Sequence, residues 1–178
     1  MPAVAEPSSG RAGGRRRFSF PDPVNEVSAR LVAGGVVLLG TLAITVDEPW
    51  LIAVIAYGFF ARALAGPTFS PLAQVVTRVI TPRLGIPARP VPGPPKRFAQ
   101  AIGAALSLPA ALVALVLDMH TAAYLILALV IFAATLESVF GYCLGCRVFA
   151  ALTRLGVIPP EVCERCIDGS DGLPGTAL

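Results

Sequence analysis

The sequence is poor in charged residues: only 14% of its 178 residues are Asp, Glu, Lys or Arg, whereas 55% are hydrophobic. A soluble domain of this size carries about a quarter charged residues, so this chain has too little polar surface to cover itself in water. It has a single histidine, and its four cysteines are too few for a disulfide scaffold. It contains no Walker-type phosphate loop and no Ser/His/Asp set. The mean hydropathy of +0.74 indicates instead a small integral membrane protein.

Four apolar segments, at residues 27–46, 49–65, 98–117 and 121–136, predict the membrane spans. A spanning helix needs about 20 apolar residues, and the segments that fall short can use their flanks if Arg30 and Arg62 extend toward the interface. The expected fold class is therefore all-α, an integral membrane four-helix bundle. The alternative is a pair of hairpins that dip into the membrane without crossing it.

The basic residues are distributed unevenly along the chain. None of the 14 Lys and Arg residues lies in the links between the first and second or the third and fourth segments. With four spans, all basic segments lie on one side, which the positive-inside rule makes cytoplasmic. We therefore expect a multi-pass protein of the cell inner membrane with both termini in the cytoplasm. Residues 18–166 form the predicted membrane domain, between a disordered basic tail at 1–17 and a disordered tail at 167–178.

The two halves of the chain follow the same order of an arginine, an apolar helix, an acidic turn, an apolar helix and an amphipathic helix. Asp47 and Asp118 mark the turns, and an offset of 76 residues places Thr77-Arg78 on Thr153-Arg154. This order predicts two parallel helical-hairpin repeats about a pseudo-twofold axis along the membrane normal.

An amphipathic helix is expected to follow each hairpin, at residues 70–82 and 147–158. Each of these helices either lies on the cytoplasmic interface or packs on the other over the bundle. Six prolines between Pro82 and Pro95 predict an extended cytoplasmic linker over residues 82–97.

The cysteines form two CxxC pairs, Cys143/Cys146 and Cys163/Cys166, in the cytoplasmic segment 141–166. Stable structural disulfides are not expected in a reducing compartment. A helix that begins at Cys143 would stabilise its thiolate through free backbone amides, and Arg147 would add positive charge. In this interpretation Cys143 is the nucleophile and Cys146 the resolving thiol. The second pair lies among acidic residues and suits a relay.

A second interpretation is a metal site. The spacing CxxC-x16-CxxC falls within that of zinc ribbons, so Cys143, Cys146, Cys163 and Cys166 would complete a tetrahedral structural zinc site. A third, that the cysteines only pack, fits poorly with a paired spacing that occurs twice.

Other ionisable residues are candidates for simpler roles. Arg62 and Glu137 fall at similar depth near the inner ends of their spans, which predicts an intramembrane ion pair. That pair would be structural, or a polar site for an anion or a proton. His120, in an outer turn, is expected to be a solvated turn residue rather than a ligand.

The segments Phe20–Asn25 and Gly141–Cys146 resemble a bacterial membrane-protein family, domain of unknown function 4395, over about residues 18–158. The resemblance implies a four-helix inner-membrane protein without assigned activity, accompanied by thioredoxin-like or rhodanese-like proteins. We therefore expect a thiol–disulfide or sulfur relay whose exchange partner is a thioredoxin, a sulfurtransferase or a quinone, and no nucleic-acid partner. The alternative is a non-enzymatic membrane subunit or small-solute transporter whose four cysteines bind a structural zinc.

Overall fold

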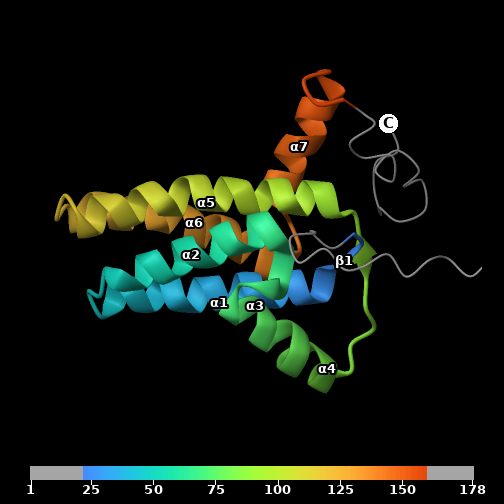
Figure 1. Ribbon diagram of the computed structural model, residues 1–178, viewed down its shortest axis with the longest axis horizontal. Coiled ribbons are helices and arrows are strands. Elements are labelled where there is room, and N and C mark those ends of the chain that lie inside the picture. Colours follow the sequence, from blue (N-terminus) through green and yellow to red (C-terminus); the bar gives the residue numbers. More distant parts are fainter. Residues whose placement is uncertain (1–21, 160–178) are drawn as a thin grey trace, which may run out of the picture.

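A computed structural model describes residues 22–159 and contains a bundle of long helices (Figure 1). They are α1 (Glu26–Thr45), α2 (Trp50–Ala65), α5 (Gly93–Leu115) and α6 (His120–Phe140). In the described part of the chain, four helical segments are long and apolar enough to cross a membrane. The all-α four-helix membrane bundle expected from the sequence is confirmed. The two tails at 1–17 and 167–178, and with them Cys163 and Cys166, lie outside the described residues.

Small side chains fill the centre of the bundle while large apolar ones point outward. Ala43, Ala110 and Ala123 are fully buried in the core, whereas Leu38 and Leu125 are 74% and 67% exposed. Small residues between helices let backbones approach closely, and exposed leucines on the outside match a lipid environment. This pattern is the reverse of what a water-soluble bundle would carry.

A second helical segment follows α2 at an angle to it. The glycine after α2, Gly66, has a φ of +64°, and a short 3-10 turn (η1, Gly66–Thr68) redirects the chain. The segment then runs without a break through α3 (Pro71–Val75), the π-helical turn η2 (Val76–Ile80) and α4 (Thr81–Leu84). This is the amphipathic helix predicted at residues 70–82.

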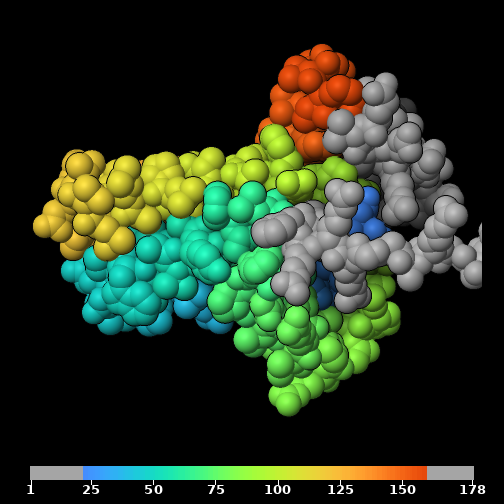
Figure 2. Space-filling model, in the orientation of Figure 1, coloured from blue at the N-terminus to red at the C-terminus, as the bar shows by residue number. Residues whose placement is uncertain are grey.

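The counterpart in the second half is α7 (Leu144–Arg154), which begins three residues earlier than predicted. Figures 1 and 2 show α7 and the 71–84 segment standing out on opposite sides of the same end of the bundle. The alternative in which these two helices pack on each other is therefore wrong.

The proline-rich linker is shorter than predicted, because α4 ends at Leu84 and α5 already begins at Gly93. Pro94 and Pro95 occupy the first turn of α5, where a helix needs no backbone N–H donors. Within the linker, β2 (Pro90–Val91) pairs antiparallel with β1 (Val24–Asn25). The backbone N–H of Glu26 also donates to the carbonyl of Arg89, at 2.9 Å. The linker is thus tied to the start of α1.

The internal repeat is visible in the backbone of the two hairpin turns. Asp47 and Asp118 have φ angles of +55° and +57°, a left-handed conformation that is uncommon for residues other than glycine. The first long helix of each half, α1 and α5, is therefore followed by the same kind of turn. The glycines after the second helices, Gly66 and Gly141, also share a positive φ, at +64° and +68°.

Hydrogen bonds between the halves follow the same symmetry. The side chain of Arg30, on α1, donates to the carbonyl of Ser138 near the end of α6, at 3.2 Å. The side chain of Arg97, on α5, donates to the carbonyl of Ala63 near the end of α2, at 2.9 Å. Each arginine thus reaches the last turn of the second helix in the opposite half, as a pseudo-twofold axis requires.

The register of the repeat near the cysteines differs from the expected offset of 76 residues. Ser70 caps the N-terminus of α3 and Cys143 caps the N-terminus of α7, so these two residues are equivalent. The thiol of Cys143 therefore occupies the place that a serine hydroxyl holds in the first half.

Candidate functional site

The best candidate site lies where α6 ends and α7 begins. Gly141, with its positive φ, ends α6, and Cys143 then caps α7: its Sγ accepts a hydrogen bond from the backbone N–H of Cys146, at 3.4 Å. The Cys146 thiol donates to Cys143 Sγ, and the two sulfur atoms are 2.7 Å apart. The two cysteines form no disulfide with each other, and both are partly exposed. Because a disulfide bond is about 2.05 Å long, only a small side-chain rotation separates this dithiol from its oxidised form.

Gly145, one of the two residues between the cysteines, positions α7 on the bundle. A Cβ atom added at Gly145 would lie 2.5 Å from both Cα and Cβ of Ala99 on α5. Further along α7, the ring of Phe149 packs edge-on against that of Phe98, with centroids 5.6 Å apart. A glycine at this point therefore lets α7 rest directly on α5 and holds the thiols near the start of α5.

A buried ion pair lies beside the thiols. Lys96 Nζ, in the first turn of α5, is 2.6 Å from Oε1 of Glu137 on α6, and the two side chains are only 10% and 14% exposed. The predicted ion pair between Arg62 and Glu137 is wrong, because Glu137 forms its ion pair with Lys96. The sequence pattern gives no sign of this ion pair, because the prolines around Lys96 predict an extended linker there rather than a helix.

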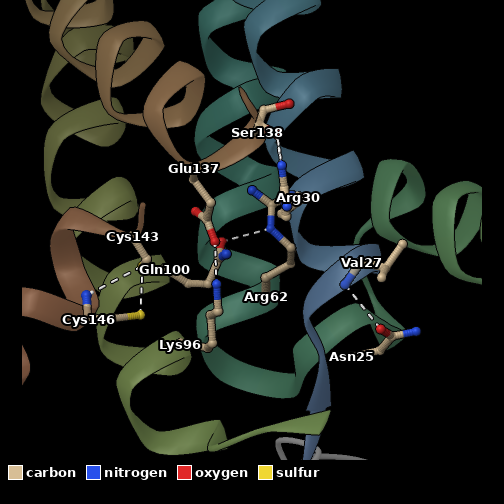
Figure 3. Close-up of polar contacts among 10 residues, drawn as sticks. All are labelled: Asn25, Val27, Arg30, Arg62, Lys96, Gln100, Glu137, Ser138, Cys143 and Cys146. Carbon is tan, nitrogen blue, oxygen red and sulfur yellow. Dashed lines mark hydrogen bonds and ion pairs between the residues drawn. The ribbon is translucent and has the colours of Figure 1, made fainter. Parts of the chain in front are cut away.

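Arg62 belongs to the same cluster but is held by neutral groups. Its Nε donates to Oε1 of Gln100 at 2.8 Å, its Nη1 donates to Oγ of Ser70 at 3.1 Å, and the guanidinium lies over the ring of Phe59. Figure 3 shows Arg62, Gln100, Lys96 and Glu137 converging next to Cys143. Gln100 was missed by sequence reasoning, although it lies four residues after Lys96 and so on the same face of α5.

The two thiols have unequal acidity. The hydrogen bond donated by Cys146 lowers the pKa of Cys143 below its ordinary value, and Lys96 acts in the same direction against burial and the charge of Glu137. The same hydrogen bond, together with burial, raises the pKa of Cys146. Cys143 is therefore the thiol that ionises first, and the roles of nucleophile for Cys143 and resolving thiol for Cys146 stay predictions.

Arg147 was expected to lower the pKa of the Cys143 thiol, but its guanidinium contacts an aromatic ring instead. Its guanidinium carbon is 5.1 Å from the ring centroid of Tyr142, in a cation–π contact. The cation that lowers the pKa of Cys143 is instead Lys96, from a helix about 50 residues earlier in the sequence.

A cavity of about 310 Å³ lies inside the bundle next to Cys143. Its lining comes from all four long helices and α7, and includes Arg62, Gln100 and Glu137. A second cavity, of about 280 Å³, lies on the other side of Arg62 and Gln100 and is lined by β1 and by Lys96. Four residues line both cavities, and the two polar ones among them, Arg62 and Gln100, lie with Ala29 and Val32 between the two spaces.

The other candidate residues are placed as follows. Within residues 22–159 no cluster of three or more Cys, His, Asp or Glu is positioned to hold a metal, and Cys163 and Cys166 of the predicted zinc site lie outside that range. His120 begins α6 at the far end of the bundle, where its Nε2 is 3.4 Å from Oδ1 of Asp118. Its side chain is 38% exposed, as a turn residue would be.

The family model described as Domain of unknown function (DUF4395) matches residues 24–154, which is most of the chain. The match spans the four long helices and the first CxxC pair and ends before the second pair. No curated protein and no solved structure matches the chain.

Proposed function

The chain belongs to the DUF4395 family, and from this premise we propose that it is a membrane-anchored thiol–disulfide relay acting through Cys143 and Cys146. The observation that carries the proposal is the contact of the two sulfur atoms at the N-terminus of α7, 2.7 Å apart. This contact lowers the pKa of Cys143 and raises the pKa of Cys146. A buried cation next to a helix-capping thiol is an environment that favours a reactive thiolate.

The exchange begins with the thiolate of Cys143. It attacks one sulfur of a partner disulfide, which breaks the partner's S–S bond and forms a mixed disulfide. The Cys146 thiol then loses its proton and attacks Cys143 Sγ, so that the partner leaves with both of its thiols reduced. In the reverse direction a partner dithiol gives two electrons to the Cys143–Cys146 disulfide. A thioredoxin-like or rhodanese-like protein is the proposed partner, with Cys163 and Cys166 as the relay pair.

The proposed location is the cell inner membrane, with the thiols and both termini in the cytoplasm. The support is the distribution of basic residues, which leaves the outer turns at Asp47 and Asp118 without Lys or Arg. In Figure 1, β1 and α7 lie at the same end of the bundle, which an even number of spans requires.

Glutathione disulfide tests the proposed roles of the two thiols in purified full-length protein whose Cys163 and Cys166 are replaced by serine. Wild-type Cys143 and Cys146 should resolve to an internal disulfide. The Cys146→Ser variant should retain one glutathione on Cys143, because no resolving thiol is left. The matched Cys143→Ser variant should react far more slowly. Equal reaction of both variants would contradict the assignment of Cys143 as the nucleophile.

Metal analysis of the purified full-length protein with all four native cysteines tests the zinc alternative. About one zinc per chain with slow alkylation of the thiols would overturn the relay and support a non-enzymatic subunit or transporter. Metal-free protein with a reversible Cys143–Cys146 disulfide would support the relay.

A further inference from the structure

We propose that the cavity beside Cys143 binds a lipid-soluble quinone, which takes electrons from the Cys143/Cys146 pair. This rests on the proposed thiol function and adds the class of oxidant that the pair uses. Cys143 lines the cavity together with Arg62, Gln100 and Glu137. A molecule bound there is in contact with both the nucleophilic thiol and the polar cluster.

The cavity has the size and walls of a site for an apolar ring. At about 310 Å³ it falls at the lower end of the range of small-molecule sites. Its walls include Val36, Leu106 and Val130, together with the ring of Phe59, which carries the guanidinium of Arg62 over one face.

The mouth of the cavity faces the lipid side of the bundle. Leu129 and Phe132, on α6, line the cavity and are also 60% and 61% exposed on the outside of the bundle. On a membrane-spanning helix this exposure is to lipid. A ligand therefore enters sideways from the bilayer, which selects for a lipid-soluble molecule.

The polar end of the cavity provides hydrogen-bond donors for a carbonyl oxygen. The hydrogen bonds of Arg62 use Nε and Nη1, and Gln100 accepts with Oε1. Among residues 22–159, Nη2 of Arg62 and Nε2 of Gln100 have no hydrogen-bond partner, and Arg62 is only 5% exposed. A quinone brings carbonyl acceptors on a flat apolar ring, whereas an acyl chain would leave these donors unpaired. A small anion, in turn, would leave the apolar walls unfilled.

The proposed reaction balances. Cys143 and Cys146 together give up two electrons and two protons and form one S–S bond. The quinone gains these two electrons and two protons and leaves as a quinol. A cytoplasmic dithiol protein then reduces the Cys143–Cys146 disulfide by exchange, so the relay runs toward oxidation of its protein partner.

The test uses pre-reduced full-length protein in detergent under anaerobic conditions, with decylubiquinone as the probe and quinol formation followed by absorbance. We expect one quinol per dithiol and a rate that saturates with quinone concentration, because the quinone binds before it reacts. A rate that stays linear in quinone concentration would overturn the proposal. It would mean that a thiol meets the quinone in solution and that lipid or detergent fills the cavity.

Two variants on α6 test whether the cavity is the site. Ala133 lines the cavity, so Ala133→Trp should fill it and slow quinol formation by about tenfold or more. Ala128 is exposed on the same helix and is not among the residues that line the cavity, so Ala128→Trp is the matched control and should react like the wild type. Equal rates in the two variants would contradict the cavity as the site.

The quinone proposal and the underlying thiol function can fail separately. Equilibration of the wild-type Cys143/Cys146 pair with a glutathione redox buffer measures the thiol function without any quinone. A pair that does not equilibrate overturns both proposals. A pair that equilibrates with glutathione but forms no quinol overturns the quinone proposal alone.

Discussion

At Cys143, two neighbours of opposite charge act on one thiol. Lys96 lowers the pKa of Cys143 and Glu137 raises it, while the two charges neutralise each other at 2.6 Å. The pair therefore serves two purposes: it satisfies two buried charges, and it sets how much of Cys143 is thiolate. Removing either charge should change the reactivity of the thiol in a direction that its sign determines.

Lys96→Met should raise the pKa of Cys143 and so reduce the fraction of thiolate at pH 7. Below the pKa, each unit of increase slows alkylation about tenfold, because only the thiolate reacts. Lys96→Arg keeps the charge and is the control, whereas Glu137→Gln should speed alkylation. The measurement is the rate of iodoacetamide labelling of Cys143 against pH. An unchanged midpoint in Lys96→Met would show that the lysine does not act on this thiol.

The hydrogen bond between the thiols can be tested independently of charge. Cys146→Ala removes the donor to Cys143 Sγ and should shift the pH midpoint of Cys143 alkylation upward, since that bond is the largest cause of its lowered pKa. Cys146→Ser keeps a donor at nearly the same place and should leave the midpoint closer to that of the wild type. If alanine and serine give the same midpoint, the hydrogen bond has no such effect.

Among the elements, α7 depends on its contact with α5, and Gly145 is the residue that allows it. Replacing glycine by alanine within a helix is ordinarily favourable by about 1 kcal/mol. Here the added methyl would lie 2.5 Å from Ala99, so we expect Gly145→Ala to lower the thermal midpoint by several degrees. It should also move α7 away from Lys96 and slow alkylation of Cys143.

The control for Gly145→Ala is Ala150→Leu, on an exposed position of α7. It should change neither the thermal midpoint in detergent nor the alkylation rate. A Gly145→Ala variant as stable and as reactive as the wild type would show that α7 is free to move away from α5.

At the same scale, sequence patterns located the helices far better than the contacts between them. The long apolar runs and the acidic residues at Asp47 and Asp118 were enough to place four helices and their turns. They failed near Pro94 and Pro95, because prolines in a first helical turn look the same in a sequence as prolines in an extended linker. The apolar run therefore predicts a start of α5 that is too late, and the sequence does not show that Lys96 pairs with Glu137.

For the molecule as a whole, the orientation in the membrane that we propose from the distribution of basic residues is open to a direct test. Starting from a variant with all four cysteines replaced by serine, Met119→Cys places one thiol in the outer turn, where Met119 is 54% exposed. In intact cells a membrane-impermeant maleimide should label it.

The matched single-cysteine variant retains only Cys143. It should be labelled only after the cells are opened. Labelling of Cys143 from outside would reverse the proposed orientation.

The pairing of β1 with β2 ties the start of α1 to the chain just before α5, and so to both halves of the molecule. Strand β1 also lines the second cavity, next to Arg62, Lys96 and Gln100. The helices are thereby tied together at that end, whereas Leu129 and Phe132, which line the cavity beside Cys143, are exposed on the outside of the bundle. If a ligand enters at these two side chains, as we propose, we expect occupancy of the cavity beside Cys143 to follow how strongly a compound partitions into the bilayer and how abundant it is there.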